Sequence, residues 1–266
     1  MFDRFNRNLN YLRISVTDRC NLRCTYCMPE EGIKLFRHDD VLSFDEIAQF
    51  TDLAVSKGVT KVRITGGEPL VRKGIANLIR LLSEIKGIGD LSMTTNGTLL
   101  KMFAQELKDS GLHRVNISLD TIDPGKFRSI TRSGNLNDVF EGIDAAKKAG
   151  LLPVKINCVI KKSKEEEEAK AVTRFCNENE LEIRYIHQMD LVRGHFSVVD
   201  GGTGGDCSLC NRLRLTSNGK LKPCLFSNIE LDIRELGYEK ALRQAVELKP
   251  ECGSRNETDA FYNIGG

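Results

Sequence analysis

Apolar and polar residues alternate along short segments of this chain, and longer segments with a helical period separate them. The alternating segments predict six strands, at residues 11–16, 60–65, 90–95, 113–119, 153–160 and 182–187. Apolar residues at intervals of three and four predict helices near 43–57, 74–85, 99–110, 136–149 and 164–179. Strands that alternate with helices predict an α/β fold whose parallel sheet is open or curled into a partial barrel.

Local signals support the helix ends. Ser43 followed by Glu46 predicts a capping box at the start of the first helix. Gly58 and Gly150 follow predicted helices, where a left-handed residue commonly ends the helix.

The predicted strands are not uniformly apolar, although parallel strands covered on both faces usually are. Arg13 alternates with Leu12 and Ile14, and the pattern recurs in the second, fourth and fifth strands. Because successive side chains of a strand point to opposite faces, the polar residues of each strand share one face. These residues are Arg13, Ser15 and Thr17; Lys61, Arg63 and Thr65; Asn116, Ser118 and Asp120; and Lys155 and Asn157.

We expect this polar face to line a cavity inside the curled sheet. Its cations predict an anionic ligand such as a phosphate chain, since guanidinium groups bind phosphate oxygens with paired donors. The alternative is that Lys61, Arg63 and Lys155 are surface charges paired with acids.

Composition narrows the class of protein. The 266 residues suit one large α/β domain, or one domain with a small appendage. Although 29% of the residues are charged, the net charge is only +2, which argues against a general nucleic-acid-binding surface. No apolar run approaches the roughly 20 residues of a membrane span. The polar N-terminus shows no signal peptide, so we expect a cytoplasmic protein with reduced thiols.

Cys20, Cys24 and Cys27 directly follow the first predicted strand. Thiolates are the usual ligands of iron–sulfur clusters, and three of them leave one iron of a four-iron cluster open to a small molecule. A structural zinc site would require four ligands. Structural or zinc-binding cysteines are the alternative interpretation.

A glycine-rich connection at 201–205 precedes a different region, and we therefore predict two parts, 1–190 and 191–266. The second part carries Cys207, Cys210 and Cys224, again three thiols. A second cluster with an open iron is the favoured interpretation, and a zinc knuckle completed by Cys252 or a histidine is the alternative. A helix-like stretch at 237–248 argues against Cys252 as a ligand. We expect Cys158, Cys176 and Cys252 to be core or surface residues.

The first cysteine motif, together with Gly66-Gly67-Glu68-Pro69, resembles the radical S-adenosylmethionine (SAM) superfamily. The whole chain resembles one of its families, the GTP 3′,8-cyclases, which begin molybdenum cofactor biosynthesis. The matching segments are 12–29, 63–70, 94–97, 116–120, 210–215, 219–226 and the final residues 264–266.

This resemblance implies a partial (β/α)6 barrel with a small C-terminal region that carries a second cluster. Cys20, Cys24 and Cys27 would hold a [4Fe–4S] cluster whose open iron chelates SAM. The remaining SAM contacts would be Tyr26, beside the adenine, and Gly66, Gly67, Glu68, Thr94 and Ser118. Reductive cleavage of SAM would give a 5′-deoxyadenosyl radical that removes the ribose 3′ hydrogen of GTP, after which the carbon radical attacks guanine C8.

The resemblance also assigns the substrate end of the site. Cys207, Cys210 and Cys224 would hold a second [4Fe–4S] cluster that takes the guanine edge. Gly265 and Gly266 would form a catalytic tail that reaches into the site. An electron donor is implied, and the oligomeric state is left open, with a homodimer among the alternatives. The triphosphate contacts would be Arg13, Lys61, Arg63, Lys155, Arg184, Arg212 and Arg214.

Two departures from the family pattern leave other functions open. Several dozen residues are missing directly after the sixth strand, at 191–206, and His187 stands near a position where the family usually has an acid. A related radical SAM cyclase that acts on another nucleotide is therefore an alternative. A peptide-modifying radical SAM enzyme, a non-enzymatic iron–sulfur carrier and a zinc-stabilised binding module are further alternatives.

Overall fold

A curved sheet of nine strands forms the frame of the protein in the computed structural model, which describes residues 1–258 and 261–264. The strand order is β6-β5-β4-β3-β2-β1-β7-β8-β9; the first seven strands in this order are parallel, and β8 and β9 are antiparallel. The strands are β1 (Tyr11–Ser15), β2 (Lys61–Thr65), β3 (Asp90–Thr95), β4 (Arg114–Ser118), β5 (Lys155–Ile160), β6 (Glu182–His187), β7 (Arg212–Leu215), β8 (Lys220–Lys222) and β9 (Leu231–Asp232). The six predicted strands are confirmed, and β7 pairs with β1, so the C-terminal region continues the same sheet.

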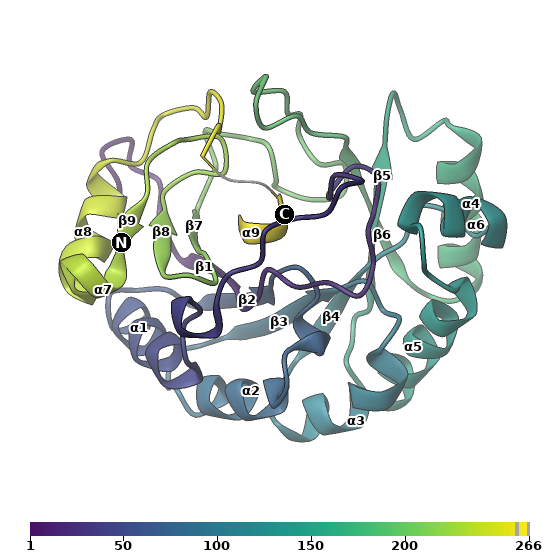
Figure 1. Ribbon diagram of the computed structural model, residues 1–266, viewed down its shortest axis with the longest axis horizontal. Helices are drawn as coiled ribbons and strands as arrows, with labels where there is room; N and C mark the ends of the chain where they lie inside the picture. The colour runs from purple at the N-terminus through teal and green to yellow at the C-terminus, as the bar shows by residue number, and fades with distance from the viewer. Residues whose placement is uncertain (259–260, 265–266) are drawn as a thin grey trace.

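Helices cover the convex side of this sheet (Figure 1). They are α1 (Phe44–Ser56), α2 (Ile75–Ser83), α3 (Leu100–Asp109), α4 (Pro124–Thr131), α5 (Leu136–Lys148), α6 (Glu167–Glu178), α7 (Ile233–Leu236) and α8 (Tyr238–Glu247); the short helix α9 (Phe261–Ile264) lies elsewhere. The five helices predicted between the first six strands are confirmed, as is the capping box of Ser43 and Glu46. The sequence analysis missed α4, although Asp123 caps it and Pro124 occupies its first turn.

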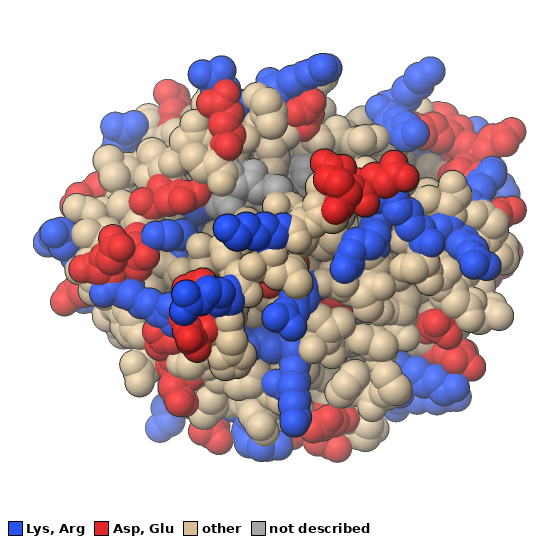
Figure 2. All heavy atoms as spheres, viewed as in Figure 1, with Lys and Arg blue, Asp and Glu red and all other residues tan. Residues whose placement is uncertain are grey.

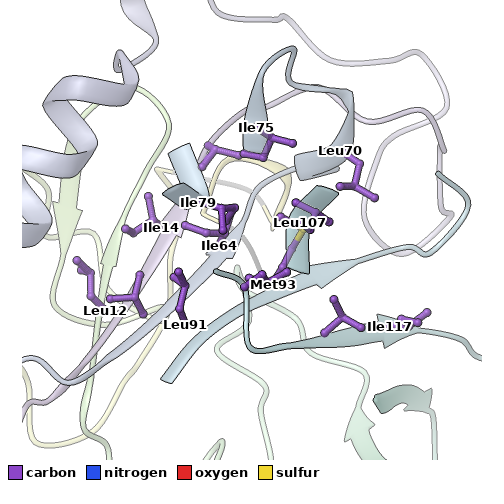
Figure 3. Packing of buried hydrophobic residues seen from close by; sticks show 14 of the residues in the cluster. Leu12, Ile14, Ile64, Leu70, Ile75, Ile79, Leu91, Met93, Leu107 and Ile117 are labelled. Atoms are coloured by element: carbon purple, nitrogen blue, oxygen red, sulfur yellow. The ribbon is translucent and has the colours of Figure 1, made fainter. Parts of the chain in front are cut away.

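The main core lies between the sheet and these helices. Leu12, Ile14 and Ile64 are fully buried on the strands, and Figure 3 shows them together with Ile75 and Ile79 of α2. Each such side chain contributes about 1.5–3 kcal/mol by leaving water. The apolar set of each strand therefore faces the helices, as the alternation predicts, and the polar set is left on the concave side.

Two glycines let the end of β2 press against the chain beyond β1. Gly67 N donates to Thr17 O at 2.7 Å, and Glu68 N donates to Arg19 O at 2.8 Å. A Cβ atom on Gly67 would lie 2.2 Å from Arg19 O, and one on Gly66 would lie 2.7 Å from Thr17 O. The turn after β2 thus fixes the backbone that leads to Cys20.

The C-terminal helix α9 lies inside the curve of the sheet (Figure 1). Ile264 is fully buried there in a second apolar cluster with Leu191, Leu225 and Phe226. The last described residue is thus anchored in the interior, whereas Gly265 and Gly266 lie outside the described residues.

Charges of both signs are interspersed over the face shown in Figure 2, with no large area of one sign. None of the described helices combines the length and the apolar character that crossing a membrane requires.

Replacing Gly67 with Ala should lower the free energy of unfolding by at least about 2 kcal/mol, because the new methyl group would collide with a backbone carbonyl. Gly89→Ala is the matched control, since its Cβ would meet no atom nearer than 3.7 Å and the change should stay within about 0.5 kcal/mol. Urea unfolding of the two variants makes the comparison; equal stabilities would contradict the close approach.

Candidate active site

A cavity of about 450 Å³ opens on the concave side of the sheet, a size that suits a small-molecule ligand. Among the described residues its wall carries two acids, Asp90 and Asp206, against a much larger set of cations. The basic side chains that line it are Arg13, Lys61, Arg63, Arg114, Arg184, Arg212 and Arg214. The predicted cation-lined cavity is present.

Strand register places these cations in rows. Arg13 of β1 lies opposite Arg63 of β2 on one side and opposite Arg214 of β7 on the other. Neighbouring strands lie about 4.8 Å apart, so the three guanidinium groups share one small volume. Two residues nearer the strand N-termini, Tyr11 lies opposite Lys61 and Arg212.

Burial and mutual repulsion disfavour the charged forms of the guanidinium groups in this row. Burial, followed by the charge of Arg214, lowers the pKa of Arg13 to about 10, and burial lowers the pKa of Arg214 to about 10. Burial also lowers the pKa of Arg63 to about 9, and the charges of Arg13 and Arg114 act in the same direction. An anion among these side chains would favour their charged forms.

Neighbouring groups hold the guanidinium planes in place. The guanidinium group of Arg63 lies 5.4 Å from the centre of the Tyr11 ring, a cation–π contact, and that of Arg212 lies 5.5 Å from the same ring centre. Arg114 is bound by Asp90 through two hydrogen bonds of 3.0 and 2.6 Å. The sequence analysis missed Arg114, although it alternates with Asn116 and Ser118 on the same strand.

Two predicted residues lie elsewhere. Lys155 is not among the described residues that line the cavity; its ammonium group contacts the carboxylate of Glu182 on β6. This pairing is the surface alternative that the sequence analysis left open for it. His187 ends β6 and is likewise absent from the described cavity lining.

The first three cysteines lie in the loop beyond the C-terminal end of β1. Cys24 O accepts hydrogen bonds from Cys27 N at 3.0 Å and from Met28 N at 2.9 Å, which forms a tight turn. Helix α4 supports this loop, since Thr131 O accepts from Arg23 N at 3.1 Å. Burial raises the pKa values of Cys24 and Cys27 to about 12, so iron binding must displace thiol protons.

Polar side chains around this loop are firmly held. Tyr26 Oη donates to Asp120 Oδ2 at 2.8 Å. The carboxylate of Glu68 accepts from Thr95 Oγ1 at 2.8 Å and Asn96 N at 2.7 Å, and burial raises the pKa of Glu68 to about 7.

Several buried polar atoms lack a hydrogen-bond partner within the described residues. Among them are Thr94 Oγ1 on β3 and Asn116 Nδ2 on β4, which occupy opposite register positions on the inner face. Buried polar groups are nearly always hydrogen-bonded, so these atoms indicate a polar ligand between the guanidinium row and the first cysteine loop. Ser118 lies one register step further, opposite Asn157 of β5.

The second set of cysteines lies at the other end of the strands, where Cys207, Cys210 and Cys224 all line the cavity. Strand β7 begins two residues after Cys210, and the antiparallel β8 ends two residues before Cys224, so the hairpin brings both to one end. Because β7 runs parallel to β1, this end is opposite to the loop of Cys20.

Cys252 was expected to be a core or surface residue; its side chain is exposed, but it lies beside the second set of cysteines, which the sequence analysis did not predict. Its sulfur is 3.2 Å from the sulfur of Cys207. The helix α8 between Cys224 and Cys252 returns the chain to the cysteine site instead of leading it away. By contrast, Cys158 and Cys176 are buried core residues, as expected.

The short segment after β6 forms part of the cavity wall. Phe196, Val199 and the glycine-rich run 201–205 all line the cavity. A turn closes this segment through Val199 N, which donates to Gly204 O at 2.7 Å. The residues that follow the sixth strand thus shape the cavity near the second set of cysteines.

Comparisons with known proteins agree with this geometry. Residues 14–176 match the Radical SAM superfamily, and residues 154–254 match the Molybdenum Cofactor Synthesis C family. GTP 3′,8-cyclase of Thermodesulfovibrio yellowstonii is 45% identical over 94% of this chain and 95% of its own length. The Moorella thermoacetica enzyme of the same name is 41% identical over the full length of both chains. That alignment of 324 positions spans only 266 residues here, so several dozen positions have no counterpart.

Solved structures share the fold at low identity. The SAM-bound enzyme anSMEcpe matches with a TM-score of 0.62 at 14% identity, over 91% of this chain and 81% of its own. Streptococcus suis SuiB bound to SAM matches with a TM-score of 0.55 at 23% identity, over 69% of this chain; the matched part is 41% of SuiB.

The curled parallel sheet, the cysteine loop beyond its first strand and the full-length similarity lead to one conclusion. This chain is a radical SAM enzyme and belongs to the GTP 3′,8-cyclase family of molybdenum cofactor biosynthesis.

Proposed function

We propose that this enzyme converts GTP to (8S)-3′,8-cyclo-7,8-dihydroguanosine 5′-triphosphate. The observation that carries the proposal is the row of buried guanidinium groups between two sets of cysteines at opposite ends of the strands, the second of which lines the cavity. A triphosphate is an anion that the forks of these guanidinium groups can bind, and the proposal agrees with the activity named for the relatives.

Cys20, Cys24 and Cys27 would hold the first [4Fe–4S] cluster, and their three thiols suit a cluster with one open iron. When bound, this cluster supplies the electron that cleaves SAM into methionine and a 5′-deoxyadenosyl radical. Thr94 and Asn116 would donate to polar atoms of SAM, which gives their buried groups the partners they lack among the described residues. Tyr26, Gly66, Gly67, Glu68 and Ser118 would complete this pocket.

Arg13, Arg63 and Arg214 would bind the triphosphate. Each presents a planar fork that can donate two hydrogen bonds to phosphate oxygens, and each is only 8% exposed, so water competes weakly. Lys61, Arg184 and Arg212 would add charge at the rim of the same row.

Cys207, Cys210 and Cys224 would hold a second [4Fe–4S] cluster at the base-binding end. Burial raises the pKa of Cys210, but Lys249 and Arg212 together more than offset burial, and the net shift of the pKa is downward. With triphosphate and base held at fixed points, the ribose between them is oriented toward the first cysteine loop.

Gly265 and Gly266 would act as the catalytic C-terminal tail. Ile264 supports this proposal, because its buried position fixes the chain inside the curve of the sheet directly before them. Glycine allows backbone to approach a ligand closely.

A second candidate is a related cyclisation of another nucleotide. The short glycine-rich segment 201–205 lines the cavity, and several dozen positions of the relatives have no counterpart in this chain. This difference alters the wall near the base and leaves the guanidinium row intact, so the base is the part of the substrate that would change.

A single-turnover reaction tests the proposal. With both clusters reconstituted anaerobically, SAM, a reductant and GTP should give the 3′,8-cyclised nucleotide, identified by mass spectrometry. ATP should give none, and Cys207→Ala should lose cyclised product by at least about 100-fold while still cleaving SAM, because the base would lose its anchor. SAM cleavage with no GTP-derived product in the unmodified enzyme would overturn GTP as the substrate.

Thr94→Val should weaken SAM binding by about 3- to 10-fold, because SAM loses a donor. The same change should leave the ligand-free protein as stable or up to about 1 kcal/mol more stable, since a buried hydroxyl without a partner in the described residues is removed. Calorimetry with SAM and urea unfolding give the two readouts.

Thr95→Val is the matched control on the adjacent residue. Its hydroxyl donates to Glu68 at 2.8 Å, so its loss should destabilise the ligand-free protein by about 1–3 kcal/mol. If Thr94→Val lost as much stability as Thr95→Val, the Thr94 hydroxyl would have a structural partner and the assignment would be wrong.

A further inference from the structure

A fourth thiol stands at the second cysteine site. Cys252 Sγ lies 3.2 Å from Cys207 Sγ, while Cys207, Cys210 and Cys224 line the cavity. Its position depends on contacts that come from three distant parts of the chain.

Arg7 fixes the backbone on the N-terminal side of Cys252. Its guanidinium group is buried beside Asp3 at 2.7 Å and donates to Pro250 O at 2.7 Å and to Glu251 O at 2.8 Å. The same group donates to Cys207 O at 2.7 Å. One buried cation therefore joins Cys207 to the residue that precedes Cys252.

Lys249 joins this segment to the other two cysteines. Its ammonium group is 1% exposed and donates to Pro223 O at 2.6 Å, next to Cys224. It also donates to Arg212 O at 2.8 Å, two residues after Cys210.

The C-terminal side of Cys252 is equally constrained. A Cβ atom on Gly253 would lie 3.0 Å from Cys224 Sγ, so only glycine fits easily against that sulfur. Ser254 N donates to Phe226 O at 2.9 Å, and Asn256 Nδ2 donates to Leu225 O at 2.9 Å. Residues on both sides of Cys252 are thus tied to the cysteine site.

The number of thiols and their spacing bear on the ligand. Four thiolates are the complete ligand set of a [4Fe–4S] cluster and also of a structural zinc site, so the spacing has to distinguish the two. Within residues 1–258 and 261–264, no group of three or more His, Cys, Asp or Glu closes around a single metal ion. A cluster spaces its thiolates more widely than one ion does, and the exposed Cys252 side chain can turn away from Cys207 to admit it.

We propose that Cys252 is the fourth ligand of the second cluster in the substrate-free enzyme. This inference rests on the second cluster of the proposed function. The guanine edge would then reach iron by ligand exchange: the bond from iron to Cys252 sulfur breaks, the thiolate takes up a proton, and a bond from iron to a guanine nitrogen or oxygen forms. No electron is transferred in this exchange.

Resistance of the cluster to oxidation tests the inference directly. In a parent variant with Cys20, Cys24 and Cys27 changed to Ala, the reconstituted second cluster is observed alone. Under mild ferricyanide oxidation the parent should keep all its iron and show no [3Fe–4S] signal in electron paramagnetic resonance spectra. Cys252→Ala in the same parent should lose one iron per cluster and show that signal, because three-thiolate clusters release their unique iron.

Cys176→Ala is the control, since it removes a buried thiol in α6 and should behave like the parent. The intact enzyme with SAM bound gives the same measurement without changes to the first loop. Equal conversion in the parent and in Cys252→Ala would overturn the inference and leave the second cluster standing. A disulfide between Cys207 and Cys252 in anaerobically purified protein would also overturn it.

A failure of the proposed function would give a different result in the same experiment. If the parent bound no iron, or bound zinc in its place, the second cluster itself would be wrong, and the role of Cys252 with it.

Discussion

The burial of like-charged guanidinium groups on the concave face of the sheet is the constraint on which the structure depends. Arg13, Arg63 and Arg214 lie side by side in register, and each is almost removed from water. Burial and mutual repulsion both disfavour the charged forms of these side chains, and an anion beside them favours those forms. The opposite face carries most of the apolar core and packs against the helices, and its burial keeps the sheet intact.

The sheet topology places the remaining chemistry around this row. The first cysteine loop follows the C-terminal end of β1, and the second set precedes β7, which runs parallel to β1. The two thiol sets must therefore lie at opposite ends of the strands, with the cations between them. The unsatisfied atoms of Thr94 and Asn116 lie one step from the cations toward the first loop. A nucleotide bound between the two thiol sets would therefore have its sugar directed toward SAM by the arrangement of the strands.

Local patterns predicted most of this arrangement, since side-chain alternation and helical spacing depend on neighbours in the chain. The strands, the capped first helix and the polar face follow from such patterns. Lys155 shows their limit: alternation placed it on the polar face correctly, but its pairing with Glu182 depends on register with β6. The position of Cys252 beside Cys207 was not predicted, because it depends on Arg7, which is more than 240 residues away. Arg7 donates hydrogen bonds to the backbone of Cys207 and of Glu251. The sequence analysis missed helix α4, although Asp123 and Pro124 form a recognisable helix start.

Nucleotide binding to Arg63→Gln tests most directly whether the guanidinium row is the phosphate site. In calorimetry on the reconstituted enzyme, this variant should bind GTP about 10- to 100-fold more weakly, while guanosine affinity stays unchanged, because only the phosphates reach the row. Arg80→Gln, which removes an exposed cation on α2, should change neither affinity. An Arg63→Gln variant that lost guanosine and GTP binding equally, or lost neither, would contradict this account.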